Sequence, residues 1–258
     1  MTWWEALLLG LIQGLTEFIP VSSSGHLVLG QHLLGLDKET ADVTFEVFVH
    51  FGTVLSILTV YWDEVADLVW EAWAGLRAPA DVPARYAEND TFRLGVFILV
   101  TLVPTGVAYV IFREDLEQAF SSPQLTSAML LVTGILLLLT MIRSQPDGEL
   151  SGLKAVVVGV AQSFAMIPGI SRSGATICTA LYQNVKPERA ANFSFLMLLP
   201  VVIGATILKG LELAEQGLGT AGVPLFLGTV AAYGSGIVAI YVVLDVVRRG
   251  NLQYFAYY

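Results

Sequence analysis

The chain is poor in charged residues, and this scarcity is the first limit on its structure. Asp, Glu, Lys and Arg together make up 14% of its 258 residues, whereas about 25% is usual for soluble domains. Hydrophobic residues make up 55%. An ordinary soluble domain is therefore excluded, and we expect most of the surface to face lipid.

Cysteine and basic residues are also scarce. The single cysteine, Cys178, excludes an intramolecular disulfide and any site built from Cys-x-x-Cys. Lys and Arg number 13 against 22 Asp and Glu, a formal net charge of −9, so nucleic acid is not an expected partner. The N-terminus MTWWEALLLG lacks the basic region of a signal peptide, and we expect the first apolar segment to be retained.

Uninterrupted apolar runs identify the crossings. A span needs about 20 apolar residues, and such runs lie at roughly 44–62, 93–112, 125–142, 193–211 and 223–246. Two further stretches, 5–36 and 153–184, are interrupted by Pro, Ser, Gly and charge. We expect each of these to form a broken-helix hairpin that returns to its own side. The acidic stretches at 63–67, 81–90 and 114–117 are expected to be solvated loops.

Positive charge distinguishes the two faces. If both hairpins return to the side they left, one face receives Arg77, Arg85, Arg143, Lys154, Lys186, Arg189, Arg248 and Arg249, with Arg93 at its edge. The other face keeps Lys38, Arg113 and Lys209. The positive-inside bias makes the first face cytoplasmic. Hairpin 5–36 then enters from outside and hairpin 153–184 from inside.

The two hairpins also match in sequence. A shift of 149 positions aligns, without a gap, Gly10 with Gly159, Gln13 with Gln162, Ser22 with Ser171, Ser24 with Ser173 and Gly25 with Gly174. Opposite entry and shared polar positions predict an inverted repeat whose hairpin tips meet within the membrane.

The predicted fold is thus an all-α polytopic membrane protein built from two inverted-topology repeats. Each repeat combines a re-entrant broken-helix hairpin with transmembrane helices. We expect one integral membrane domain over 1–258, with repeat 1 at about 1–112 and repeat 2 at about 125–258.

The first polar break, residues 13–26, carries groups that can react. Gln13 and Glu17 share a helical face, and Pro20 ends or kinks that helix. Hydroxyl and imidazole side chains follow: Ser22, Ser23, Ser24 and His26. A carboxylate that can bind a divalent ion or move a proton therefore lies beside candidate nucleophiles and a group that titrates near neutral pH.

Each of these groups also has an ordinary interpretation. Glu17 suits a structural ion pair, although intramembrane carboxylates are functional by default. The serines suit a helix cap, and His26 suits a satisfied polar position. His32 and His50 lie outside the breaks, and we interpret them as ordinary polar residues of that kind.

The second polar break, residues 168–176, carries an arginine. A guanidinium within a membrane is costly and persists where an anion pairs with it, and its donors suit phosphate oxygens. Further donors lie around Arg172 at Ser171, Ser173, Gly174 and Thr176, where an apolar helix begins. The two breaks together hold what a phosphate-hydrolysis or phosphotransfer site requires.

The stretches QGLTEFIPVSSSGH and PGISRSGAT resemble the two signature motifs of the undecaprenyl-pyrophosphate phosphatases, the bacitracin-resistance family. The resemblance covers nearly the whole chain, including Phe45-Glu46, Gly52-Thr53 and the segment Asn192 to Pro200. It implies hydrolysis of a C55 polyprenyl pyrophosphate to the monophosphate carrier lipid at the outer side of the cytoplasmic membrane. It also implies a divalent cation, Mg²⁺ or Ca²⁺, as cofactor. The implied partners are this lipid substrate and the membrane lipids, and a homodimer is a further expectation.

The resemblance implies roles for single residues. The family's catalytic positions match Glu17, Ser22, Ser23 and His26, and its phosphate-binding arginine matches Arg172. Together with the donors named above, Ser24 completes the predicted phosphate site, and Glu17 with Gln13 is the predicted metal site. The family accepts Glu or Gln at the position of Gln13. The nucleophile stays open among Ser22, Ser23, His26 and water, with Ser23 preferred.

A secondary transporter or flippase of an anionic lipid is the alternative function, because inverted repeats with broken helices also build transporters. A transporter needs the counter-charge of Arg172 but not the carboxylate, hydroxyl and imidazole set, so we favour the hydrolase. Family chains usually continue with another apolar helix after a stretch like Phe255 to Tyr258, whereas this sequence stops at Tyr258, and we expect the family's last crossing to be missing from it.

Overall fold

A computed structural model describes residues 1–36, 43–142, 146–216 and 222–258. Within these ranges the regular structure is helical, apart from one isolated bridge between Gly148 and Val185. The elements are α1 (Trp3–Phe18), α2 (Ser23–Leu33), α3 (Val43–Val60), α4 (Trp62–Arg77), η1 (Pro79–Asp81), α5 (Val82–Glu88), α6 (Asp90–Ala119), α7 (Pro123–Leu139), η2 (Thr140–Ile142), α8 (Gly152–Phe164), α9 (Arg172–Tyr182), α10 (Pro187–Leu196), α11 (Leu198–Gln216), α12 (Gly222–Arg248) and α13 (Gln253–Tyr257). Lys38, Arg143 and the side chain of Lys209, used above to compare the two faces, lie outside the described residues.

The predicted crossings are present as long apolar helices. In the described ranges, Asp90–Ala119, Pro123–Ile142, Pro187–Ile207 and Gly222–Arg248 are each long and apolar enough to span a membrane. A further span is the pair Thr44–Val60 and Trp62–Arg77, which bends by 92°. Each of these overlaps one predicted span, so the all-α, multi-pass architecture is confirmed.

The acidic segment after the third helix is helical, and the expectation of a loop there is wrong. After the bend, α4 carries Asp63 and Glu64 in its first turn, where carboxylates interact favourably with the helix dipole. The rest of α4 is rich in good helix formers such as Ala, Leu and Glu. The stretch 114–117 likewise belongs to α6. In these segments the acidic residues therefore indicate exposed helices and not loops.

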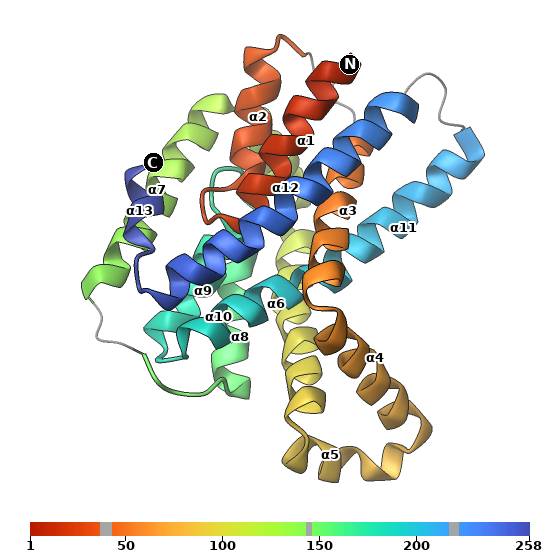
Figure 1. Cartoon of the computed structure of the whole chain (residues 1–258), viewed down its shortest axis with the longest axis vertical. Coiled ribbons are helices and arrows are strands. Elements are labelled where there is room, and N and C mark those ends of the chain that lie inside the picture. The colour runs from red at the N-terminus through yellow and green to blue at the C-terminus, as the bar shows by residue number, and fades with distance from the viewer. Residues whose placement is uncertain (37–42, 143–145, 217–221) are drawn as a thin grey trace.

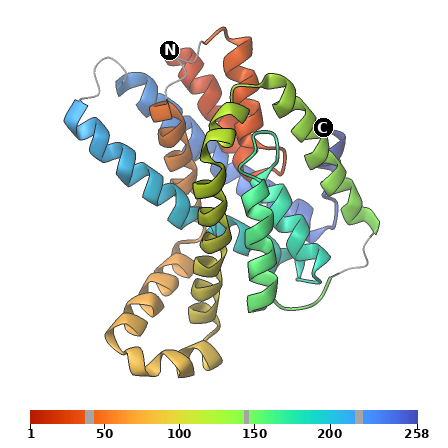
Figure 2. The same ribbon diagram turned by 180° about the vertical axis from the view of Figure 1, so that it is seen from behind.

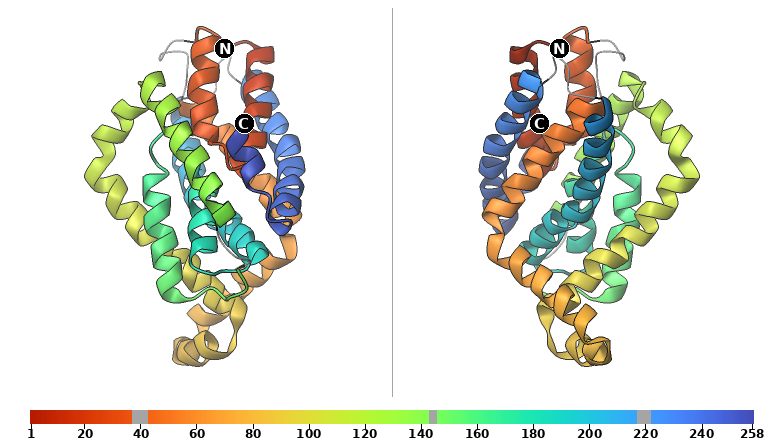
Figure 3. Two further views of the ribbon diagram at one scale, coloured as in Figure 1. Left: turned by 90° about the vertical axis from the view of Figure 1, so that its left-hand side faces the viewer. Right: turned by 90° about the vertical axis from the view of Figure 1, so that its right-hand side faces the viewer.

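The helices pack into one bundle from which α4, α5 and the start of α6 extend at one end (Figure 1). Helices α1, α3 and α12 pack side by side, α6 runs along α8, and both α2 and α13 contact α7. Figure 3 shows the red α1–α2 hairpin above the green-to-teal α8–α9 hairpin. Segments 78–89 and 146–151 of the predicted cytoplasmic face lie towards the lower end, whereas the N-terminus and the α6–α7 turn lie at the upper end (Figure 2).

Helices α1 and α12 approach until their backbones touch. A Cβ added at Gly10 would overlap the Gly228 carbonyl, and a Cβ added at Gly14 would overlap the carbonyl of Ala232 and the hydroxyl of Ser235. Small residues permit such contacts between membrane helices. Because α1 also carries Gln13 and Glu17, this contact sets the position of the first polar break.

The main apolar core lies around the end of α1. The rings of Phe18 and Phe195 meet edge to face with centroids 5.3 Å apart, and Tyr61 packs on Phe195 at 6.4 Å. The outward side of α6 is different, since Val103 and Val110 are 65% and 78% exposed. Aliphatic side chains exposed in this way along a span fit a surface that faces lipid.

Glu149 ties the lower connections together. Its carboxylate accepts a hydrogen bond from Lys186 Nζ at 2.7 Å and lies 3.8 Å from Arg189 Nε, and its carbonyl accepts from Lys154 Nζ at 2.7 Å. The bond from Lys186 lowers the pKa of the Glu149 carboxyl below its ordinary value of 4.5. Glu149 therefore links the start of α10 through its carboxylate to the start of α8 through its backbone carbonyl.

Candidate functional site

The first polar break follows from the way α1 ends. Helical structure stops at Phe18, and Ile19 is extended, with φ −60° and ψ 129°, because the following proline disfavours a helical residue before it. Ser22 then adopts a φ of 71° and caps α2, accepting a hydrogen bond at Oγ from Gly25 N at 3.2 Å. A positive φ is costly for serine, and such residues cluster at functional sites.

The second polar break repeats this construction. After α8, Gly169 has a φ of 97°, and a Cβ there would overlap the Thr126 carbonyl, so only glycine fits. Ser171 caps α9 and accepts from Gly174 N at 3.0 Å, as Ser22 does for α2. The predicted order of helix, irregular segment and helix is confirmed in both hairpins.

The tips of the two hairpins lie in contact. A Cβ added at Gly25 would be 3.1 Å from Gly169 Cα, so the first tip packs directly on the second. Across this contact, Arg172 Nη2 donates to Glu17 Oε1 at 2.8 Å. The two groups that the sequence singled out thus meet, whereas the inverted relation of the two halves stays a prediction.

Donors surround the Glu17 carboxylate. Its Oε2 accepts from Ser23 Oγ at 2.6 Å and from Gln13 Nε2 at 2.9 Å, which confirms that Gln13 and Glu17 share a helical face. The His50 Nε2 atom lies 3.6 Å from the same oxygen. The carboxylate side chain is only 5% exposed, and charge-assisted hydrogen bonds compensate its burial.

Arg172 is fixed by a second partner, on α10. Its Nη1 donates to the Ser194 carbonyl at 2.6 Å, a group near the end of that helix, where carbonyls lack helical partners. The hydroxyls of Ser194 and Thr176 are 2.6 Å apart and join α10 to α9. Arg172 Nε is buried and has no hydrogen-bond partner among the described residues. The two partners thus use two of the five N–H groups of the guanidinium.

A cavity of about 230 Å³ lies beside the Glu17–Arg172 pair. Its polar lining consists of Glu17, Ser22, Ser23, Ser24, His50, Thr105, Gln162 and Arg172. Its apolar lining consists of Ala165, Met166, Ile170, Met197, Leu198, Val201 and Val202. A cavity with a charged, hydrogen-bonding part and an apolar wall suits a ligand that has an anionic head and a hydrocarbon tail.

Several predicted site residues lie behind this lining. Ser171 Oγ holds the α9 cap and contacts Ser173 Oγ at 3.2 Å, and both residues are buried. Thr176 Oγ1 donates to the Arg172 carbonyl at 2.8 Å, and Gly174 N is engaged by the cap. These groups support the arginine from behind, and direct phosphate binding by them stays a prediction.

His50 lines the cavity and His26 does not, although the sequence singled out His26. His26 Nδ1 donates to the Ser22 carbonyl at 2.8 Å, and its Nε2 lies 3.3 Å from Tyr258 Oη, with the two rings stacked. His26 is not part of the cavity lining, and its catalytic role stays a prediction. His50, interpreted above as an ordinary polar residue, lines the cavity and faces Glu17. A polar side chain in the middle of an apolar span was the signal that could have identified it.

The site offers few protein ligands for a metal ion. Among the described residues there is no group of three or more His, Cys, Asp and Glu side chains arranged to hold a metal. Gln13 Oε1, however, is buried without a hydrogen-bond partner in that part of the chain, next to the Glu17 carboxylate. One carboxylate and one amide oxygen fit Mg²⁺ or Ca²⁺ if substrate phosphates and water supply the other ligands.

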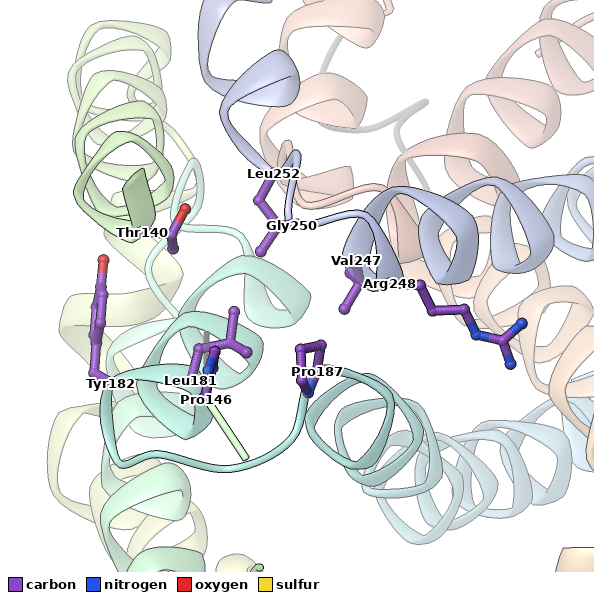
Figure 4. A pocket seen from close by; sticks show the side chains of 9 residues that line it. All are labelled: Thr140, Pro146, Leu181, Tyr182, Pro187, Val247, Arg248, Gly250 and Leu252. Carbon is purple, nitrogen blue, oxygen red and sulfur yellow. The ribbon is translucent and has the colours of Figure 1, made fainter. Parts of the chain in front are cut away.

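A second, smaller cavity of about 90 Å³ lies between the ends of α9 and α12 (Figure 4). Its lining includes Leu181, Pro187, Val247 and Leu252, while Arg248 extends away and pairs with Glu188 at 2.9 Å. The described residues of this lining include no carboxylate or imidazole. The cavity beside Glu17 and Arg172 is therefore the better candidate of these two.

A family model matches nearly the whole chain. The family model for the bacitracin resistance protein BacA matches residues 6–258. The chain belongs to this family. It is 85% identical over 258 residues to the undecaprenyl-diphosphatase of Salinibacter ruber, covering 100% of this chain and 96% of that protein. The corresponding protein of Halothermothrix orenii is 40% identical over 258 residues, covering 98% and 93% of the two chains. That of Bacteroides fragilis (strain ATCC 25285) is 37% identical over 263 residues, covering 100% and 94%.

Proposed function

We propose that this BacA family member is an undecaprenyl-diphosphatase, which hydrolyses the C55 polyprenyl pyrophosphate to the monophosphate carrier lipid and inorganic phosphate. The observation that carries the proposal is the Ser23–Glu17–Arg172 chain of hydrogen bonds, at 2.6 and 2.8 Å, in a cavity with an apolar wall. The names of the relatives support the substrate. The product lipid would then re-enter the synthesis of cell-wall polysaccharides, and bacitracin resistance follows from this recycling.

The substrate fits the cavity in one direction. Arg172 is the cationic group of the described lining, so the pyrophosphate lies beside its guanidinium. The first isoprene units lie along the apolar side, against Met166, Ile170 and Leu198. A soluble phosphate ester lacks this second part, so the apolar wall favours lipid substrates.

The hydrogen bond between Ser23 and Glu17 provides a route for a proton. As Ser23 Oγ attacks the terminal phosphorus, its proton passes to Glu17 Oε2, which already accepts that hydrogen bond at 2.6 Å. The bond from the terminal phosphorus to the bridging oxygen breaks, and the prenyl monophosphate leaves with the proton from Glu17, which restores the carboxylate. Water then attacks the phosphoserine, which releases inorganic phosphate and restores the Ser23 hydroxyl. Arg172 stabilises the charge on the phosphoryl oxygens in both steps.

A divalent cation, Mg²⁺ or Ca²⁺, is part of the proposal. Arg172 and Glu17 carry opposite charges and neutralise each other, so the added negative charge of a pyrophosphate needs a further cation in a site of low dielectric. Glu17 and the Gln13 Oε1 atom would hold it. When bound, it would supply Lewis-acid polarisation of the phosphoryl oxygens.

We place the protein in the cytoplasmic membrane with the end of α4 and the start of α8 on the cytoplasmic side. The described cations of that face include Arg77, Arg85, Lys154 and Lys186, and the positive-inside bias supports this orientation. The family resemblance supports a site that is reached from the outer side. A homodimer stays a prediction.

The test is phosphate release from a polyprenyl pyrophosphate by purified protein in detergent, with a divalent ion and with a chelator control. Glu17→Gln keeps the shape of the side chain but cannot accept the Ser23 proton as a carboxylate does, so we expect at least about a hundredfold slower release. Glu5→Gln is the matched control on the same helix, because Glu5 only bonds the Thr2 backbone at the start of α1.

The same preparation separates the hydrolase from the transporter. Normal release by Glu17→Gln would contradict the site assignment. Wild-type protein that releases no phosphate but moves labelled lipid between the leaflets of proteoliposomes would instead favour the flippase. Acid-stable phosphate on Ser23, detected by mass spectrometry in a single turnover, would identify the nucleophile.

A further inference from the structure

His50 lines the same cavity as Ser23 and Arg172, yet the proposed hydrolysis gives it no role. We propose that His50 Nε2 is a ligand of the divalent cation, together with the Glu17 carboxylate. The proposal rests on the cation of the proposed function, and it adds a nitrogen ligand to a site otherwise built from oxygen.

The orientation of the imidazole ring is the first support. His50 Nδ1 lies 2.7 Å from the Glu46 carbonyl, and because a carbonyl only accepts, Nδ1 carries the proton. In neutral imidazole this leaves the lone pair on Nε2, which faces Glu17 and the cavity. Metal-binding histidines commonly donate their other N–H to a backbone carbonyl or carboxylate, which fixes the tautomer in this way.

The distance between the two facing atoms is the second support. His50 Nε2 and Glu17 Oε2 are 3.6 Å apart, beyond the roughly 2.7–2.9 Å of a charge-assisted N–H···O bond. Two donor atoms bound to one ion at about 2.1 Å each lie roughly 3.0–3.4 Å apart in octahedral or tetrahedral geometry. The observed separation is a few tenths of an ångström wider, so a small shift of the ring brings both atoms into ligand positions.

The neighbouring amide is the third support. Gln13 Nε2 donates to the Glu17 oxygen that His50 faces, while Gln13 Oε1 is buried without a partner among the described residues. Glutamine brings no charge to this position, so Glu17 is the one carboxylate among the described residues of the cavity lining. A neutral imidazole then provides a stronger ligand than an amide for transition ions. It shifts the preference of the site toward Mn²⁺ or Co²⁺ relative to Ca²⁺.

The experiment measures the ligands of bound Mn²⁺ directly. Full-length protein is loaded with Mn²⁺ in detergent, and electron spin-echo spectroscopy detects nitrogen nuclei coupled to the ion, with ¹⁵N-histidine labelling to identify the source. We expect a histidine nitrogen coupling in the wild type that His50→Ala removes, with Mn²⁺ affinity at least about tenfold weaker. His32→Ala, an exposed histidine of α2 outside the cavity lining, is the matched control and should keep the coupling.

Each other outcome is decisive. A wild type without histidine coupling, or a coupling that survives His50→Ala, overturns the proposal. A coupling lost in His26→Ala but kept in His50→Ala assigns the ligand to His26 and overturns it as well. His50→Gln guards against misfolding, because it keeps a polar side chain and should abolish the nitrogen coupling while binding Mn²⁺ more weakly than wild type.

Failure of the cation proposal is distinguishable from failure of the proposed function. Phosphate release by wild type with Mg²⁺, but no nitrogen coupling with Mn²⁺, keeps the hydrolase and removes His50 as a ligand. A His50-dependent coupling in a protein that releases no phosphate keeps the metal ligand and removes the hydrolase.

Discussion

Replacing Arg172 by Ala should destabilise the protein strongly, because it strands a buried carboxylate. The substitution removes the 2.8 Å bond to Glu17 and the 2.6 Å bond to the Ser194 carbonyl. Glu17 is 5% exposed and Arg172 15% exposed, so water from the cavity replaces only part of these two interactions. Loss of one partner of a buried ion pair costs about 3–5 kcal/mol, and we expect Arg172→Ala to fall in that range.

The pairwise part of this cost can be isolated with Glu17→Gln. Gln cannot carry the charge that Arg172 compensates, so the double variant should be less unstable than the sum of the single variants, by about 1–3 kcal/mol. The assay is the free energy of unfolding in mixed micelles titrated with a denaturing detergent, measured for wild type, both single variants and the double variant. Additivity of the two changes within about 0.5 kcal/mol would show that the pair does not hold the hairpin tips together, and the account of the site would fail.

Three further outcomes follow from the contacts. Ser23→Ala should lower phosphate release by at least about a hundredfold without a comparable loss of unfolding free energy. Ser127→Ala, an exposed serine of α7 whose hydroxyl bonds the Pro123 carbonyl, should stay within a few fold of wild type, and equal losses in the two variants would contradict the assignment. Gly14→Ala should lower the free energy of unfolding by about 1–3 kcal/mol in the same assay, because the new Cβ overlaps a carbonyl and a hydroxyl of α12. The control Gly204→Ala has open space around the new Cβ and should be neutral or slightly stabilising. The pKa of Glu149 is lowered in the folded protein, so its ion pairs contribute to the free energy of unfolding above pH 4.5, and this contribution is lost as the pH falls below that value. Glu149→Gln should therefore reduce the acid-induced loss of unfolding free energy by less than about 1 kcal/mol. An unchanged loss at acid pH would refute this.

The spans and the two broken hairpins could be predicted because they depend on local sequence. A span requires a long apolar run, and the two breaks lie at Pro20 and at the Pro168-Gly169 pair. Spans and breaks can therefore both be predicted from the residues that form them. The meeting of Glu17 with Arg172 was also predictable, since two costly charges in apolar surroundings need each other.

The details that sequence reasoning missed depend on helix rotation and on neighbours. His50 lies on an apolar helix, and whether it faces lipid or Glu17 is set by the packing of α3 on α1 and α12, which the hydropathy pattern does not specify. Ser194 binds Arg172 through its backbone carbonyl, and a motif of side chains cannot predict a backbone contact. The acidic α4 was mistaken for a loop because charge reports exposure, while helix formation depends on propensity and dipole effects.

The ion pair between the hairpin tips also bears on the end of the reaction. Glu17 and a phosphate oxygen compete for the same guanidinium, since Arg172 Nη2 already has a carboxylate partner at 2.8 Å. As inorganic phosphate leaves, the Glu17 carboxylate replaces it at the guanidinium. This carboxylate is already part of the chain, so no translational entropy is lost in binding it. The Glu17 carboxylate thus opposes product inhibition by competing with phosphate for Arg172. A substitution that removes the charge of Glu17 would remove this competition, so the enzyme would retain phosphate longer and bind its substrate more tightly.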